Sequence, residues 1–362
     1  MSEHSNIPAL FGSSWQQFVD EWCLGTPPST APDECVRALA ALVVHWPERA
    51  QGLATGAIRG LSVIANAIDA GLILADASRL AGAEPVISRL RSGERGSLSE
   101  LTVGSALVRL GFQPAFGVAA GTKVPDLALT IESTTTFVEV IAPDRADIVK
   151  RFTDRIGEVA SSVLAFSSNA NVELFLDSDP DELDIATLAT VIADAAFSDD
   201  VQSVSSVGRF LKRPYSFPPV VSPAVPNKTS GTVLGVARAV VNGDHTTGAL
   251  TAVRAVVFDG RARRILAAEL HHFTKTNPNV LIIDTGGVAG GIHDWAPSIE
   301  RCFQPAQNTR ISAVVLYFTG VMGNPAQTHR VWRVLINPHA VNPIPGALVE
   351  ALTRLPTTLP AA

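Results

Sequence analysis

The spacing of apolar and polar positions divides the chain into a helical first part and a mixed second part. Residues 13–92 are rich in Ala, Leu and Arg and lack the period-two alternation of strands, which predicts a helical N-terminal region. A further helix is predicted from about Leu98 to Leu110, with Ser97 as its N-cap and Gly111 as its C-terminal stop.

Short apolar runs of strand character follow this helix. Strands are expected at FQPAFGV, VPDLALTI and TFVEVIA, followed by a helix over about 144–166, a strand at 171–177 and a helix over about 180–197. This order indicates an α/β domain with a mixed sheet. Residues 198–230 are expected to be irregular. Beyond them, TAVRAVVFDG, RRILAAELHHF, NVLIIDTGG, ISAVVLYF and HRVWRVLIN predict further strands and one helix that extend the same sheet.

The length and composition set limits on domains and partners. A chain of 362 residues with 46% hydrophobic residues is long enough for two domains or one elaborated domain. We expect a helical region over 1–95, an α/β domain with a C-terminal extension over 96–345, and a tail over 346–362. The net charge of −6 counts against a non-specific DNA binder, so nucleic-acid contacts would depend on local basic patches.

Cysteine usage and the N-terminus indicate a compartment. The three cysteines are far apart and fit no metal-binding spacing, which is typical of a reducing cytoplasm. The first residues lack a basic segment followed by an apolar run. The most apolar stretch, residues 60–75, is too short to span a bilayer and contains Asp69. We expect a cytoplasmic protein that does not bind a membrane.

Two carboxylates, Asp126 and Glu139, occur in predicted strands that are otherwise almost wholly apolar. A two- or four-residue loop between the strands places them on one face, about 4.5–8 Å apart, whereas a three-residue loop places them on opposite faces. Like charges that close in an apolar setting are unfavourable unless a cation bridges them or one is protonated. Mg²⁺ is the natural partner of carboxylates presented in this way.

Pro125-Asp126, Glu139 on the following strand and Glu100 on the preceding helix together resemble the PD-(D/E)XK nuclease superfamily, over about residues 96–180. The resemblance implies a restriction-endonuclease-like fold, a mixed β-sheet core flanked by helices. It implies that Asp126 and Glu139 hold Mg²⁺ or Mn²⁺, with Glu100 as a third carboxylate. Ser97-Leu-Ser-Glu100 is also a capping box, which by itself explains a Glu at that position.

The chain departs from the family at the motif lysine, which in the family lies two residues after the Glu and orients the attacking water. Ile141 occupies that position here. Lys150, on the helix expected next, is the better substitute. Lys123 is the other candidate, but a regular strand directs it away from Asp126.

A basic and aromatic segment, GRFLKRPYSF (208–217), is the candidate nucleic-acid contact. Arg209, Lys212 and Arg213 can neutralise phosphates, and the aromatic residues between them can stack on bases. The alternative is a solvated loop with a few anchoring side chains.

Three functions follow from these patterns. The first is a Mg²⁺-dependent endonuclease acting on DNA. The second is a catalytically degenerate protein of the same fold, in which Ile141 marks lost catalysis and the chain binds DNA or a protein within a bacterial defence or mobile-element system. The third is an unrelated α/β protein with Asp126 and Glu139 on different faces of the sheet. A homodimer, or a partner protein bound through the N-terminal helices, remains open in each case.

Overall fold

The computed structural model describes residues 31–54, 61–144, 170–176, 187, 190, 202–205, 208–214, 232–233, 250–254, 256–257, 261–287, 291–322 and 327–357. The chain divides into two units. The first comprises residues 1–142, 263–286 and 298–362, and the second comprises residues 143–262 and 287–297. The predicted helical N-terminal region therefore belongs to the same unit as the strands that carry Asp126 and Glu139.

Five helices open the described part of the first unit, as the apolar pattern predicts: α3 (Ala31–His45), α4 (Pro47–Ala54), α5 (Leu61–Ala77), α6 (Ala83–Arg91) and α7 (Arg95–Arg109). Helices α3 and α5 approach closely at Gly71, where an added Cβ would lie 2.3 Å from the carbonyl oxygen of Ala38. Only glycine fits this contact, because a backbone atom fills the space that any side chain needs.

The predicted end of α7 is confirmed, but its predicted start is wrong. Gly111 has a φ of 91°, and Gly111 N–H and Phe112 N–H donate to the carbonyls of Val108 and Leu107, which forms a Schellman motif. The helix begins at Arg95, so Ser97 lies inside it. The buried hydroxyl of Ser97 has no hydrogen-bond partner among the described residues, which rules out the capping box.

A six-stranded mixed sheet forms the centre of the first unit, in the order β1-β2-β3-β10-β11-β12. The strands are β1 (Ala115–Phe116), β2 (Leu127–Ile131), β3 (Thr134–Ile141), β10 (Asn279–Asp284), β11 (Ala313–Met322) and β12 (Gln327–Ile336). β3, β10 and β11 are parallel neighbours, and the other pairs are antiparallel. The predicted α/β class with a mixed sheet is confirmed.

The β2–β3 hairpin turns through two residues, Glu132 and Ser133. Ile131 pairs with Thr134 and Leu127 pairs with Val138, so Asp126 faces Glu139 when this register is continued by one position. Glu132 has a φ of 57°, a conformation that favours glycine, and its side chain is exposed. Of the loop lengths considered from the sequence, the two-residue loop is the one observed.

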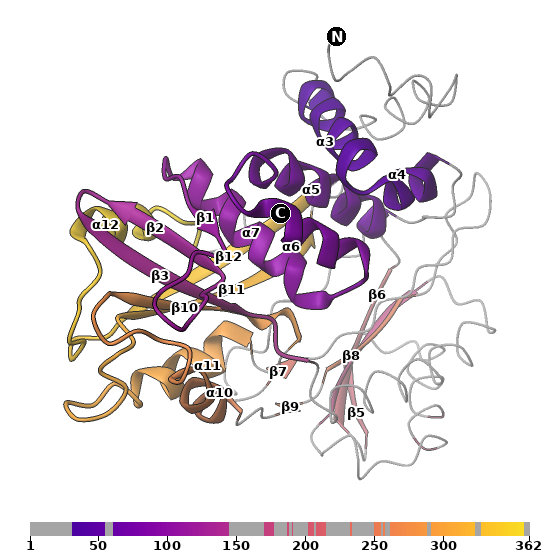
Figure 1. Ribbon diagram of the computed structural model, residues 1–362. Helices are drawn as coiled ribbons and strands as arrows, with labels where there is room; N and C mark the ends of the chain where they lie inside the picture. The colour runs from indigo at the N-terminus through magenta and orange to yellow at the C-terminus, as the bar shows by residue number, and fades with distance from the viewer. Residues whose placement is uncertain are drawn as a thin grey trace. The chain divides into compact units, whose positions relative to one another are not determined.

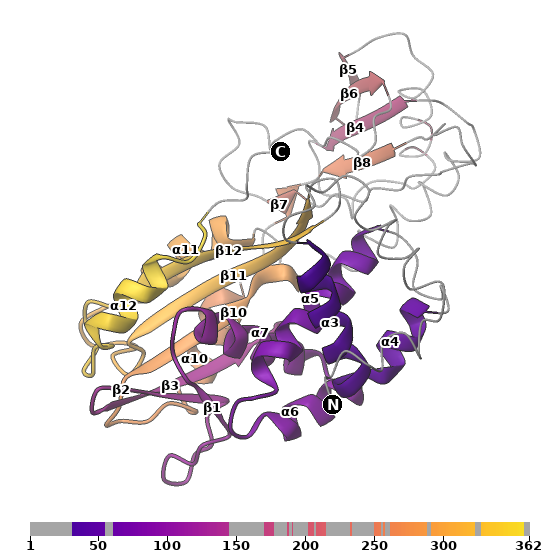
Figure 2. The same ribbon diagram turned by 90° about the horizontal axis from the view of Figure 1, so that it is seen from above.

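Helices cover both faces of the six-stranded sheet (Figure 1). One face packs on α5, α6 and α7, with α3 packed on α5, and it includes the buried side chains of Leu127, Leu129, Val138, Ile282 and Val315. The second face includes Leu281, Ile283, Val314 and Leu316, which are fully buried. Helix α10 (Ala262–Glu269) lies on this side, and the view from above shows α3 and α4 farther from the strands than α7 (Figure 2). Helix α12 (Gly346–Thr353) adds Leu348 and Leu352 to the first face. The segment expected as a tail thus begins with a packed helix.

The second unit contains a separate four-stranded sheet in the order β5-β6-β4-β8. Its strands are β4 (Ala170–Leu176), β5 (Gln202–Ser205), β6 (Gly208–Pro214) and β8 (Leu250–Arg254), and β7 (Thr232–Val233) pairs separately with β9 (Val256–Val257). Two predictions are therefore wrong. The strands at 171–177 and 250–254 do not join the sheet of β2 and β3, and residues 198–230 are not irregular throughout.

Some remaining elements lie at the division or outside the described residues. Helix α11 (Gly291–Glu300) has residues in both units, and a 3₁₀ turn, Thr285–Gly287, follows β10. The predicted helix over 144–166 falls outside the described residues except at Asp144, and of that over 180–197 only Thr187 and Thr190 are described, both helical. Within the described ranges, no helix has both the length and the apolar content needed to cross a membrane.

Candidate active site

Asp126 and Glu139 lie together where β2 begins and β3 ends. The Asp126 carboxylate accepts a hydrogen bond of 2.7 Å from the backbone N–H of Val140, and the Glu139 carboxyl accepts one from the backbone N–H of Asp126. The two carboxyls also lie close enough for their charges and hydrogen-bonding groups to interact. The two carboxyls therefore lie on one face, which is one of the two arrangements left open by the sequence, and this excludes the arrangement that the third function requires.

Burial makes these two carboxyls hard to ionise. Glu139 is only 7% exposed. Burial, together with the charge of Asp126 and the hydrogen bond to it, raises the pKa of Glu139 from 4.5 to about 8. Burial also raises the pKa of Asp126, although the hydrogen bonds from Val140 and Glu139 oppose this. The pair therefore shares a proton at neutral pH, as expected for like charges in contact.

Glu100 lies in the first turns of α7, close enough to Asp126 for their charges to interact. Burial, followed by the charge of Asp126, raises the pKa of Glu100 to about 7, against the lowering effect of Arg89. Arg89 Nη2 donates to Glu100 Oε2 at 2.6 Å. Glu100 is thus near the pair but already bound by a guanidinium.

Two residues near the pair, Glu269 and His272, were not predicted from the sequence. They lie at the end of α10 and in the turn after it. Burial raises the pKa of Glu269, and the charge of Asp126 adds to this rise. His272 opposes the rise and also lowers the pKa of Asp126. The exposed imidazole of His272 is thus near two carboxyls. The three-residue spacing in ELHH is a weak signal, because nothing local links it to Asp126.

A cluster of polar side chains lies at the end of β10, on the face of the sheet opposite to Asp126 and Glu139. Ser99 Oγ and Tyr317 Oη donate to Asp284 Oδ2 at 2.9 and 3.2 Å, and Gly286 N–H donates to Oδ1 at 2.9 Å. Ser99 directly precedes Glu100 in α7. The Asp284 contact therefore fixes the first turns of α7 over the carboxyl ends of the parallel strands, where open α/β sheets most often bind ligands.

The motif position and the two lysines considered as substitutes lie in different surroundings. Ile141, at the motif position, is half-buried at the end of β3. Lys123 Nζ donates to the carbonyl oxygens of His271 and Phe273, the latter at 2.9 Å, and so ties the loop before Asp126 to the turn that carries His272. Lys150 lies outside the described residues.

The basic residues proposed as nucleic-acid contacts fall in the second unit. Arg209, Lys212 and Arg213 belong to β6, which pairs with β5 on one side and β4 on the other. They are therefore part of a central strand of the four-stranded sheet, and the expectation of a loop is wrong for these three positions.

In the observed arrangement, a divalent cation could bind Asp126 and Glu139 but not the third carboxyl, Glu100. Among the described residues, no group of three or more His, Cys, Asp or Glu side chains is arranged to hold a metal ion. Asp126 and Glu139 supply two oxygen ligands in contact, and Mg²⁺ often binds through one or two carboxylates while keeping several waters. The pair fits such a cation, whereas Glu100 does not join it while bound to Arg89.

Comparison with known proteins adds no relative. No protein-family model, curated protein or solved structure matches this chain.

Proposed function

We propose that this protein is a divalent-cation-dependent nuclease of the PD-(D/E)XK type that hydrolyses phosphodiester bonds in DNA. The observation that carries the proposal is the close approach of Asp126 and Glu139, a half-buried and a buried carboxyl, both with raised pKa values. Such a pair is unfavourable for folding, and strained or destabilising groups of this kind concentrate at functional sites.

The order of elements around the pair supports this proposal. Helix α7 precedes three antiparallel strands, β1 to β3, and α10 precedes β10, which is parallel to β3. This is the helix, three strands, helix, strand order of the restriction-endonuclease-like core. In this alignment residues 143–261 are an insertion, and β10 takes the place that the sequence suggested for residues 171–177.

Each residue of the site has a distinct role in this proposal. Asp126 and Glu139 hold Mg²⁺ or Mn²⁺, and the bound cation lowers the pKa of a water and stabilises charge on the phosphate. The N–H groups of Val140 and Asp126 fix the two carboxyls in place. His272 can accept a proton near Asp126, and Lys150 remains the proposed helper in place of the motif lysine. Arg209, Lys212 and Arg213 are proposed to contact DNA.

A second candidate is the catalytically degenerate protein that binds DNA or a protein. Two observations favour it: the half-buried Ile141 at the motif position, and the ion pair that holds Glu100 on Arg89. A homodimer or a partner bound through the N-terminal helices fits this candidate equally well.

Cleavage of plasmid and single-stranded DNA with Mg²⁺ or Mn²⁺ tests the leading proposal. The wild type should cut, and Asp126→Asn and Glu139→Gln should each lose at least about a hundredfold in rate while remaining folded. Glu300→Gln is the matched control, because this exposed carboxylate pairs only loosely with Arg333 at 3.9 Å. Full activity in both site variants would overturn the assignment.

A further inference from the structure

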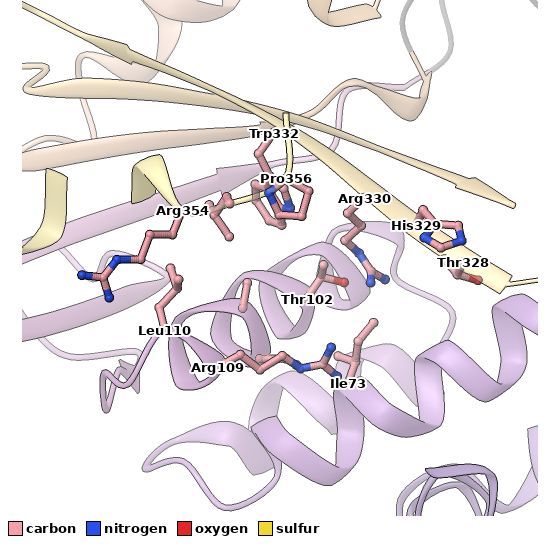
Figure 3. Close-up of a pocket in the computed structure, with 13 residues that line it drawn as sticks. Ile73, Thr102, Arg109, Leu110, Thr328, His329, Arg330, Trp332, Arg354 and Pro356 are labelled. Carbon is pink, nitrogen blue, oxygen red and sulfur yellow. The ribbon is translucent and has the colours of Figure 1, made fainter. Parts of the chain in front are cut away.

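A second candidate site occupies a pocket of about 570 Å³ in the first unit. It shares no residue with the carboxyl cluster. Helices α5 and α7 form one wall, and β12 with the segment after α12 forms the other (Figure 3). Helix α7 contributes Thr102, Ser105, Ala106 and Arg109, whose spacing places them on one helical face, and Leu110 directly follows the helix.

The lining of this pocket carries three guanidinium groups. They belong to Arg109, Arg330 and Arg354, and no Asp or Glu belongs to the lining among the described residues. Pockets with guanidinium groups and no carboxylate favour anionic ligands, because Arg binds phosphate and carboxylate with paired hydrogen bonds.

Carboxylates outside the lining hold two of these arginines in place. Arg330 forms a two-bond ion pair with Asp69, in which Nη1 donates to Oδ1 at 2.9 Å and Nη2 donates to Oδ2. Arg109 Nε donates to Asp76 Oδ2 at 2.8 Å, and the same oxygen accepts from Ser105 Oγ. Both aspartates belong to α5. The arginines are therefore preorganised, which reduces the entropy lost when a ligand binds.

The rest of the pocket is apolar and distinguishes it from a bare ion site. Leu110, Pro356 and Trp332 gather toward one end, while Arg330, His329 and Thr328 gather toward the other (Figure 3). Trp332 is fixed by stacking on Tyr317, with ring centroids 4.6 Å apart. The volume falls in the range of small-molecule sites, about 300–1,000 Å³.

We propose that this pocket binds a phosphate monoester with an apolar, planar body, the chemistry of a mononucleotide. The phosphate accepts hydrogen bonds from the terminal nitrogens of Arg109 and Arg330. The planar group lies between Leu110 and Pro356, against Trp332. This proposal does not depend on the cation site or on DNA cleavage.

Calorimetric titration of the full chain with AMP, adenosine and inorganic phosphate tests the proposal. AMP should bind, and adenosine and inorganic phosphate should each bind at least about tenfold more weakly, because each lacks one half of the ligand. Failure of AMP to bind would overturn the proposal. Adenosine or phosphate binding as tightly as AMP would overturn it too.

Two variants locate the binding. Arg109→Gln should weaken AMP binding about tenfold, whereas Arg333→Gln, on the same strand as Arg330 but outside the lining, should leave it unchanged. If Arg109→Gln fails to fold, Arg109→Lys serves instead, because it keeps the positive charge beside Asp76 and removes the paired donors of the guanidinium. It should weaken binding roughly threefold or more without lowering the melting temperature. Equal affinity in a lining variant and in Arg333→Gln would contradict the placement.

Discussion

Replacing Glu139 by Gln should make the protein more stable than the wild type at high pH. The pKa of Glu139 is raised to about 8 from the ordinary 4.5, so the folded protein holds a proton that the unfolded chain releases. The stability contributed by this proton is fully present below about pH 4.5 and is lost as the pH rises through about 8. Glu139→Gln keeps the hydrogen-bonding shape and removes the ionisation.

The magnitude follows from the same pKa. Each pKa unit corresponds to about 1.4 kcal/mol. The raised pKa of Glu139 therefore lowers the free energy of unfolding of the wild type by at most about 5 kcal/mol above pH 8. Screening by solvent and the proton shared with Asp126 reduce this value, and we expect Glu139→Gln to gain about 2 kcal/mol at pH 9. For a unit of this size the gain corresponds to roughly 4–8 °C in melting temperature.

The assay is thermal unfolding from pH 5 to pH 9 without divalent cations. The melting temperatures of wild type and Glu139→Gln should be similar near pH 5, diverge steadily as the pH rises to about 8, and stay apart above it, with the variant higher. Glu300→Gln, in which an exposed carboxylate is removed, should follow the wild type at every pH. Parallel curves for wild type and Glu139→Gln would refute the reasoning, because they would mean that Glu139 is ionised normally.

Four further substitutions test the local structure and the missing lysine. Asn279→Ala should destabilise the first unit by about 2–4 kcal/mol in urea unfolding, because the buried amide bonds to Thr274 and to the Arg310 carbonyl; a loss below about 1 kcal/mol would contradict this. Gly71→Ala should cost more than about 2 kcal/mol, since its Cβ meets the Ala38 carbonyl, and near-wild-type stability would rule out the close helix contact. Glu132→Gly should gain about 0.5–1 kcal/mol at its positive φ, and a loss would mean a different turn. Ile141→Lys should lower the pKa of Glu139 and speed Mg²⁺-dependent cleavage several-fold, and an unchanged rate would show that position 141 does not face the pair.

The hairpin and its carboxylates were predictable because they depend on local pattern. Alternating apolar residues around a short polar loop fix which positions face each other, so the contact of Asp126 with Glu139 follows once the loop has two residues. The C-terminal end of α7 was predictable for the same reason, since Gly111 supplies a left-handed residue directly after the helix.

The partner of β3 was not predictable, because it is chosen by long-range packing. NVELFLD and NVLIID have the same apolar character, and nothing local indicates that the second lies beside β3 while the first joins another sheet. The Glu269 and His272 neighbours of the pair were missed for this reason, since α10 reaches the site only through β10. Arg89 was missed because a helix arginine is usually solvated, and its pairing with Glu100 depends on how α6 packs on α7.

The measurement that tests the central claim most directly is Mn²⁺ binding to the full chain by calorimetry at pH 7, in two buffers of different ionisation enthalpy. If Asp126 and Glu139 form the cation site, the wild type binds Mn²⁺ and releases close to one proton, because Glu139 with a pKa of about 8 must give up its proton to become a ligand. Asp126→Asn and Glu139→Gln should then lose the binding. No Mn²⁺ uptake by the wild type, or equal uptake by both variants, would contradict the cation site, and absent uptake would favour the degenerate binding protein.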